Sequence, residues 1–219
     1  MPDSLGRMAR LGPEPSTAVE GVLLAKVTTS KDLLMLLLYA GGQTGQECEP
    51  IRGRTRLMKM IFLFEKEVLR KFNANKVIAA DALPDFTPYD FGPFSAQVFS
   101  DLEFLVELGF VSPKPIGGTE LPVEESMEYS YWRAGVASEV DETAPGNEEE
   151  FVLTPLGREF VEAGQAGTLG TDQWQVLSDF KARCTGTSLR GLLRYVYTKY
   201  PEQTTESKIR DEILSGSSY

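Results

Sequence analysis

The chain of 219 residues contains no histidine and only two cysteines. Without histidine it has no imidazole base, no histidine-based catalytic triad and no zinc site with an imidazole ligand. Cys48 and Cys184 lie far apart in the sequence and cannot form a four-cysteine metal site, so we expect free thiols. The sequence also lacks a phosphate-binding glycine loop and a dinucleotide motif. We therefore expect a protein that is not an enzyme and has no metal or cofactor.

Long apolar runs are also lacking. The longest, residues 33–40, is far shorter than the ~20 residues that a membrane-spanning helix needs. Near the N-terminus, Pro13 and Pro15 interrupt the region in which a signal peptide would have its apolar core. We therefore expect a cytoplasmic protein with no membrane partner.

The formal net charge of −10 is distributed unevenly along the chain. Residues 120–150 hold ten carboxylates and one arginine, a net charge of −9. Residues 52–76 hold eight lysines and arginines and two glutamates, a net charge of +6. Three interpretations of the acidic segment stay open: it engages a basic partner surface, it imitates nucleic acid, or it is a solvated loop.

The basic segment coincides with the clearest helical pattern, over about residues 55–72. Apolar residues recur there at three- and four-residue intervals, which predicts a buried stripe of Leu57, Met60, Ile61, Phe64, Val68 and Phe72. At about 100° per residue, most of the basic side chains fall on the opposite face. We predict either a solvated face, on which charge reversal at Lys59, Lys66 and Arg70 leaves stability nearly unchanged, or a site for an anionic partner. That partner would be nucleic acid, an acidic protein or the chain's own acidic insert. The candidate residues for anion binding are Arg54, Arg56, Lys59, Lys66 and Arg70.

The expected elements form a helix, a two-stranded wing and a closing helix. A short helix over 31–39, capped by Thr29 or Ser30, precedes the basic helix. The segment Tyr89-Asp-Phe-Gly-Pro-Phe-Ser95 leads into a helix over 94–108, with Pro93 suited to its first turn. This helix is expected to turn Val98, Leu102, Leu105 and Leu108 toward the core. Strands are expected from Phe110, over 127–134 and over 151–153, and residues 135–149 are expected to form a loop. Thr154 then caps another helix, with Pro155 in its first turn. This order predicts a mostly α protein with a small β wing, an α+β fold of winged-helix-like architecture.

Three parts are expected along the chain. Residues 1–28 are poor in large apolar side chains and are expected to be loosely ordered. Residues 29–165 form the winged-helix-like domain, with the acidic insert near 120–150. Residues 166–219 add a C-terminal helical extension, with helices near 171–182, 188–199 and 205–214.

Aromatic residues near the predicted wing are candidates for contact with a protein partner, since aromatics dominate interface hot spots. These candidates are Tyr89, Phe91, Tyr129, Tyr131 and Trp132. The alternative is ordinary packing, in which Tyr89, Phe91 and Phe94 fix the start of the second helix to the core. Arg54 and Arg56 oppose the dipole at the start of their helix, which indicates a specific partner. Asp85 and Asp90 are internal candidates for that partner.

Four segments together resemble the YwgA-like proteins and, more distantly, the Panacea/SocA-type antitoxin domain. They are Gly53-Arg-Thr-Arg-Leu-Met-Lys-Met-Ile-Phe-Leu63, Tyr89-Asp-Phe-Gly-Pro-Phe-Ser95, Phe151-Val-Leu-Thr-Pro-Leu-Gly157 and Tyr195-Val-Tyr-Thr-Lys-Tyr-Pro201. The resemblance covers about residues 30–214. It implies a mostly helical, winged-helix-like fold without known catalytic residues, and a role as an antitoxin or as an adaptor that brings a toxin to a protease. The long acidic insert departs from the family pattern.

Two functions stay open. One is a non-catalytic protein-interaction module: an antitoxin, adaptor or accessory subunit of a toxin–antitoxin or antiphage defence system. The other is a winged-helix transcriptional regulator that binds DNA through the basic helix 54–71, since lysine and arginine neutralise phosphates. The helix over 94–108, which would enter the major groove, carries Asp101, Glu103 and Glu107 and no lysine or arginine. We therefore favour the interaction module, with a toxin or defence-complex subunit as its partner.

Overall fold

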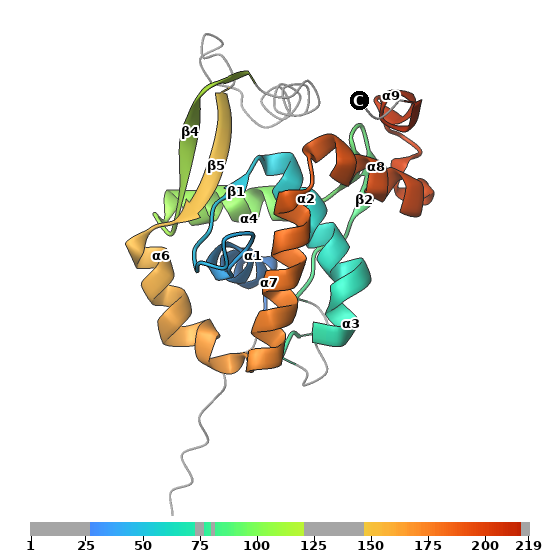
Figure 1. Cartoon of the computed structure of the whole chain (residues 1–219). Coiled ribbons are helices and arrows are strands. Elements are labelled where there is room, and N and C mark those ends of the chain that lie inside the picture. Colours follow the sequence, from blue (N-terminus) through green and yellow to red (C-terminus); the bar gives the residue numbers. More distant parts are fainter. Residues whose placement is uncertain (1–26, 73–76, 80–81, 121–146, 216–219) are drawn as a thin grey trace, which may run out of the picture.

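The computed structural model describes residues 27–72, 77–79, 82–120 and 147–215 (Figure 1). This part of the chain is mostly helical and carries a small antiparallel sheet, as expected for an α+β protein. The predicted strand over 127–134 lies outside the described residues, as does nearly all of the predicted N-terminal segment 1–28. The longer helices are α1 (Ser30–Tyr39), α2 (Arg54–Leu63), α4 (Ala96–Glu107), α7 (Thr171–Gly186) and α8 (Leu189–Lys199).

Helix α1 lies at the centre of the fold (Figure 1). It contacts α4, α7 and the strand β5 (Asn147–Leu153). The apolar run 33–40 is buried throughout, because neighbours surround this helix on several sides. Thr29 caps it by accepting a hydrogen bond from the backbone N–H of Asp32, and the Asp32 carboxylate accepts one from the N–H of Thr29. The predicted cap is confirmed.

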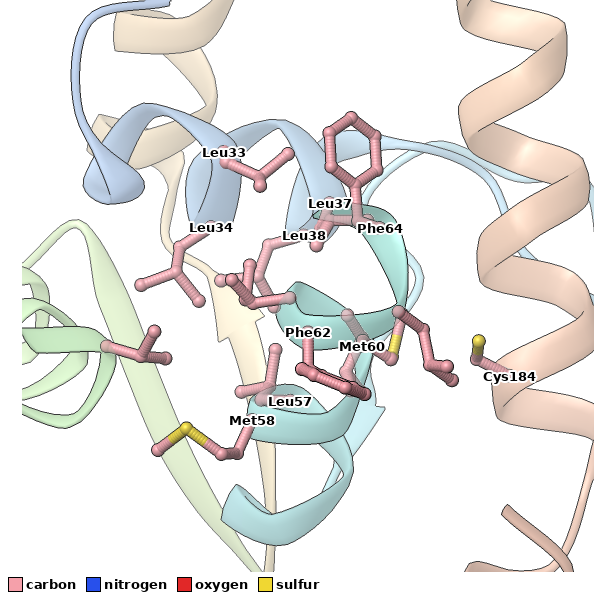
Figure 2. Packing of buried hydrophobic residues seen from close by; sticks show 14 of the residues in the cluster. Leu33, Leu34, Leu37, Leu38, Leu57, Met58, Met60, Phe62, Phe64 and Cys184 are labelled. Atoms are coloured by element: carbon pink, nitrogen blue, oxygen red, sulfur yellow. The ribbon is translucent and has the colours of Figure 1, made fainter. Parts of the chain in front are cut away.

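The predicted amphipathic helix over 55–72 is confirmed in extent. It consists of α2, a π-helical turn η1 (Phe64–Val68) and α3 (Leu69–Phe72). All six side chains of the predicted stripe are buried, and each contributes roughly 1.5–3 kcal/mol to folding. Figure 2 shows side chains of α1, such as Leu34 and Leu38, meeting those of α2 in the core, with Cys184 of α7 nearby.

The main sheet has the strand order β1-β5-β4, with β1 (Ile51–Arg52) and β4 (Val111–Glu120) both antiparallel to β5. Ile51 pairs with Phe151, and Val111 pairs with Leu153. β5 begins at Asn147, so the predicted loop over 135–149 is wrong for residues 147–149. Pairing with β4 extends the strand into the acidic segment, since Glu149 and Glu150 pair with Pro115 and Lys114.

A second, two-stranded sheet joins β2 (Thr87–Tyr89) to β3 (Gly92–Phe94). Pro93 lies in β3, so its predicted place in the first turn of α4 is wrong; Ser95 is the N-cap of that helix. Gly92 has a φ of 86°, and a Cβ there would lie 2.8 Å from Cε1 of Tyr197 in α8. Contacts from two other elements therefore keep this segment extended: Tyr197 packs on Gly92, and Lys59 of α2 binds the carbonyl of Pro93 at 3.0 Å.

The C-terminal helices contribute to the same core as α1 and α2. Thr154 caps α6 (Pro155–Phe160) as predicted, accepting a hydrogen bond from the N–H of Gly157, and Pro155 stands in the first turn. The turn η3 (Val161–Gln165) and the short turn η4 (Ala166–Thr168) connect α6 to α7. The predicted helix over 205–214 is shorter: after the turn η5 (Pro201–Thr204), α9 covers only Arg210–Ser215.

Lys181 of α7 is fully buried and connects three segments. Its Nζ donates hydrogen bonds to the carbonyl oxygens of Leu38 (3.2 Å), Ala40 (2.7 Å) and Glu49 (2.5 Å). Burial lowers the pKa of Lys181 to about 8. The lysine thus fixes the end of α1 and the loop that follows it.

Candidate protein-interaction surface

Large apolar side chains are exposed where α4 ends and α6 begins. In the part of the chain that the structure describes, only five large apolar side chains are more than 40% exposed. Four belong to these two helices: Phe104 (44%), Leu108 (47%), Leu156 (52%) and Phe160 (48%). We call these four residues, with the half-buried Phe110 between them, the α4–α6 apolar surface. Figure 1 shows the end of α4, the start of β4 and the start of α6 on one side of the molecule.

Helical spacing accounts for the exposure. Phe104 and Leu108 are four residues apart on α4, as are Leu156 and Phe160 on α6, so each pair shares a face of its helix. The opposite side of α4 packs into the core through Val98, Leu102 and Leu105. The prediction that Leu108 also faces the core is wrong, because α4 ends there at Gly109, whose φ is 73°.

The two helices are held together at the turn that ends α4. Thr154 Oγ1 donates a hydrogen bond to the carbonyl of Gly109 at 2.6 Å, and the backbone N–H of Thr154 donates to the carbonyl of Phe110 at 3.0 Å. A Cβ at Gly157 would lie 2.1 Å from the same Phe110 oxygen, so only glycine allows this approach. The rings of Phe110 and Phe160 stack at 5.0 Å between centroids. The surface is therefore preorganised, which lowers the entropic cost of binding.

Charged groups of both signs lie near this surface, and Arg158, between Leu156 and Phe160 in the sequence, is exposed. Glu107 and Glu159 are exposed beside Leu108 and Phe160 in the sequence. Lys31 lies over the ring of Phe104, 5.3 Å from its centroid, and forms an ion pair with the buried Asp101 at 2.6 Å. An apolar centre with a charged margin is suited to a partner surface that presents apolar side chains within a polar rim.

The predicted exposed basic face of the helix over 55–72 is wrong for Arg56 and Lys59. Arg56 is 9% exposed and donates hydrogen bonds to the carbonyls of Cys184 and, at 2.7 Å, Thr187. Lys59 is fully buried on the carbonyl of Pro93. The physical reason is that α4, α7, α8 and β3 all contact α2, so more than one face of this helix is covered.

The other three basic candidates differ in their surroundings. Arg54 is half-buried, forms ion pairs with Glu103 and Glu149 (3.4 Å for the second), and lies over the rings of Phe99 and Phe151. The suggested pairing of Arg54 or Arg56 with Asp85 or Asp90 is therefore wrong. Asp90 pairs instead with Lys208, at 2.6 Å. Lys66 and Arg70 are exposed, so the structure does not gather the five basic candidates into one surface.

The aromatic candidates are placed only in part. Phe91 is 5% exposed, so the packing alternative, and not partner contact, describes it. Tyr89 is half-buried, and its ring lies 5.1 Å from that of Phe94. Tyr129, Tyr131 and Trp132 lie outside the described residues.

Two further observations concern metals and membranes. Among residues 27–72, 77–79, 82–120 and 147–215, no group of three or more cysteines, aspartates or glutamates is arranged to hold a metal ion. In those same ranges, every helix is too short or too polar to cross a bilayer.

Cys48 and Cys184 are free thiols, and burial raises the pKa of Cys184 to about 12.

Comparison of the chain with protein-family models, with curated proteins and with solved structures finds no match. The resemblance to the YwgA-like proteins stays a prediction. The sequence pattern did not predict the α4–α6 apolar surface. The available signal was Phe104, an aromatic residue that stands outside the predicted core stripe of its helix.

Proposed function

We propose that the chain is a non-catalytic protein-interaction module that binds its partner through the α4–α6 apolar surface. The observation that carries this proposal is the exposure of four large apolar side chains on one preorganised surface. Contiguous exposed apolar patches with a polar margin commonly mark protein-binding sites. The charged residues beside the patch correspond to the polar rim that surrounds the apolar centre of such interfaces.

The proposal includes a winged-helix-like architecture for residues 29–165. Its support is the order of elements, α1, β1, α2, α4, β4 and β5, together with the strand order β1-β5-β4. The more specific role, an antitoxin, adaptor or accessory subunit of a toxin–antitoxin or antiphage system, rests on the motif resemblance alone. In that role the partner is a toxin or another subunit of a defence complex.

The alternative, DNA binding through the basic helix 54–71, has less support. Of the five basic candidates, Arg56 and Lys59 make internal hydrogen bonds and Arg54 is held by two carboxylates. The outer face of α4, which would enter the major groove, presents Glu107, Phe104 and Leu108. Carboxylates there would repel phosphates.

The non-catalytic role is supported by what the buried polar groups do. Lys59, Lys181 and Arg56 bind backbone carbonyls, and Asp101 accepts hydrogen bonds from Ser30, Lys31 and Gln97. These contacts account for the burial of each group by structural hydrogen bonds.

The test is an affinity purification from the native host with three tagged forms of the protein. They are the wild type, the double variant Phe104→Gln/Phe160→Gln and the control Tyr195→Gln, which removes an exposed aromatic side chain on α8. Each is treated with nuclease before mass spectrometry. We expect a stoichiometric partner with the wild type and the control, and its loss with the double variant.

With the purified partner, the double variant should weaken binding by at least about thirtyfold, the effect of losing ~2 kcal/mol at an interface hot spot. Circular dichroism establishes that each variant is folded. Equal affinity of the double variant and the wild type would refute the proposed surface. Nucleic acid that co-purifies without a protein partner and is released by salt would favour the regulator instead.

A further inference from the structure

A cavity of about 390 Å³ opens between the end of α1, the loop that follows it and α7. An aromatic pair lines it: the rings of Tyr39 and Trp174 lie 5.4 Å apart at an interplanar angle of 50°. Glu47 and Asp179 also line it, and its described lining includes no lysine or arginine. The cavity thus combines aromatic faces with two carboxylates.

The loop that forms one wall has little side-chain volume and a fixed conformation. Gly41, Gly42 and Gly45 line the cavity. A Cβ at Gly42 would lie 2.7 Å from the carboxylate of Glu49, and Gly45 has a φ of 71°. The Glu49 carboxylate accepts hydrogen bonds from the backbone N–H groups of Gly42 (3.1 Å), Gln43 (2.9 Å) and Thr44 (2.9 Å).

Lys181 holds the two ends of this loop through the carbonyls of Ala40 and Glu49. This wall of the cavity is therefore preformed. Preformed cavities of this size are suited to small ligands or single side chains.

We propose that this cavity binds an organic cation, a guanidinium or ammonium group, between the aromatic pair and the carboxylates of Glu47 and Asp179. Cations are attracted to the faces of tryptophan and tyrosine rings, and carboxylates complement guanidinium groups. The negative potential here also acts on Tyr39, whose pKa is raised to about 12, first by burial and then by Glu47. The inference goes beyond the proposed partner surface and does not depend on it.

Arg158 of α6 is an internal cation that competes for the carboxylate of Glu47. It pairs with Glu47 at 3.0 Å and with Glu162 at 2.7 Å, and Arg158 itself does not line the cavity. Asp179 accepts a hydrogen bond from the neutral Gln175 at 2.8 Å, and no ion pair of the described residues involves it. The ligand cation is therefore expected to depend most on Asp179 and to bind more tightly when Arg158 is removed.

The test uses the fluorescence of Trp174. The chain has two tryptophans, so a Trp132→Phe background leaves Trp174 as the single reporter. The probes are N-acetyl-arginine amide, its neutral isostere N-acetyl-citrulline amide, and agmatine. We expect a saturable change with at least one of the two cations and none with citrulline. An equal response to citrulline, or no saturable response to either cation, would overturn the proposal.

The two cations distinguish the source of the group. Binding of N-acetyl-arginine amide supports a basic side chain of a protein as the ligand, whereas binding of agmatine alone supports a free small amine. Either result upholds the cavity as a cation site, and neither depends on whether the α4–α6 apolar surface binds a partner.

Charge variants on the same background test the mechanism. Asp179→Asn should weaken binding of the cation by about threefold, the effect of losing one exposed ion pair. The control Asp172→Asn, at the start of the same helix and outside the cavity, should leave binding unchanged. Arg158→Gln should strengthen binding of the cation, because the carboxylate of Glu47 loses its internal partner. Equal affinities for the Asp179 and Asp172 variants would refute the assignment, once circular dichroism has shown that both are folded.

Discussion

Two regions of the molecule depart from the usual distribution of side chains: cations are buried around α2, and large apolar side chains are exposed on the α4–α6 apolar surface. Around α2 the cations point inward: Arg56 and Lys59 bind carbonyl oxygens of neighbouring elements. At the end of α4 the apolar groups point outward, with Phe104 and Leu108 nearly half exposed. Residue type therefore did not decide burial in either region. The number of neighbouring elements decided it, since α2 is enclosed on several sides and the end of α4 is not.

The largest expected effect comes from reversing a buried charge beside α2. Lys59→Glu should destabilise the fold by at least about 3–5 kcal/mol, because a buried carboxylate would face the carbonyl of Pro93 without a donor. The matched control is the double reversal Lys66→Glu/Arg70→Glu on the exposed side of the same helix. It should change stability by no more than about 0.5 kcal/mol per site.

Urea unfolding measures both variants. If Lys59→Glu lowers the free energy of unfolding by no more than the exposed double reversal does, Lys59 is not buried against the carbonyl of Pro93. The sequence-based expectation of unchanged stability then holds for the whole basic face.

The next effect is a pH dependence that belongs to Lys181. Its pKa is about 8 in the folded protein, against 10.5 for a lysine surrounded by water. Between these values the unfolded chain binds the extra proton, so this group makes stability rise as pH increases from about 8 to 10.5. The total gain is up to about 3 kcal/mol, at 1.36 kcal/mol per pKa unit.

Other groups also titrate in this pH range. The contribution of Lys181 is therefore measured as the difference in stability between the wild type and a variant without this lysine. The free energy of unfolding of the wild type minus that of Lys181→Met should increase over this pH interval and stay level between about pH 6 and 7.5. A flat difference across the whole range would show that Lys181 is not buried as a cation at neutral pH.

The smallest effects are expected on the α4–α6 apolar surface. Phe104→Gln and Leu108→Gln should each change the free energy of unfolding by less than about 0.5 kcal/mol, because both side chains keep much of their contact with water. Leu105 lies one turn before Leu108 on the buried side of α4. Leu105→Ala should lower the free energy of unfolding by about 2–5 kcal/mol. Thermal denaturation of the three variants compares them. A large loss with Leu108→Gln would mean that this residue packs in the core, as the sequence pattern suggested.

Local patterns predicted much of the fold. The period of Leu57, Ile61 and Phe64 located the main helix and its buried stripe, and capping residues such as Thr154 located helix starts. These features depend on residues within a few positions of one another. The main departures, Pro93 in β3 and the early start of β5, depend on pairing with other segments.

The candidate sites were harder to predict because their contacts are distant in the sequence. Lys181 binds carbonyls that lie 132 to 143 residues earlier in the chain, and Trp174 meets Tyr39 across a comparable separation. A helical period also cannot reveal how many neighbours surround a helix. For that reason it assigned Arg56 and Lys59 to solvent and Leu108 to the core.

The π-helical turn at Phe64–Val68 has a consequence for the length of its segment. Phe64 and Phe72 are eight residues apart, so a regular α-helix would place them about 80° apart around its axis. Both are nonetheless buried, with ring centroids 5.2 Å apart, because the wider turn takes up the surplus rotation. Deleting one residue of this turn would leave seven steps between the two phenylalanines, and a regular α-helix would then place them only about 20° apart. We therefore expect the segment to tolerate a deletion at the exposed Lys66 by becoming regularly α-helical. A deletion or substitution at Glu67 would instead remove the acceptor for the hydroxyl groups of Tyr195 and Tyr200.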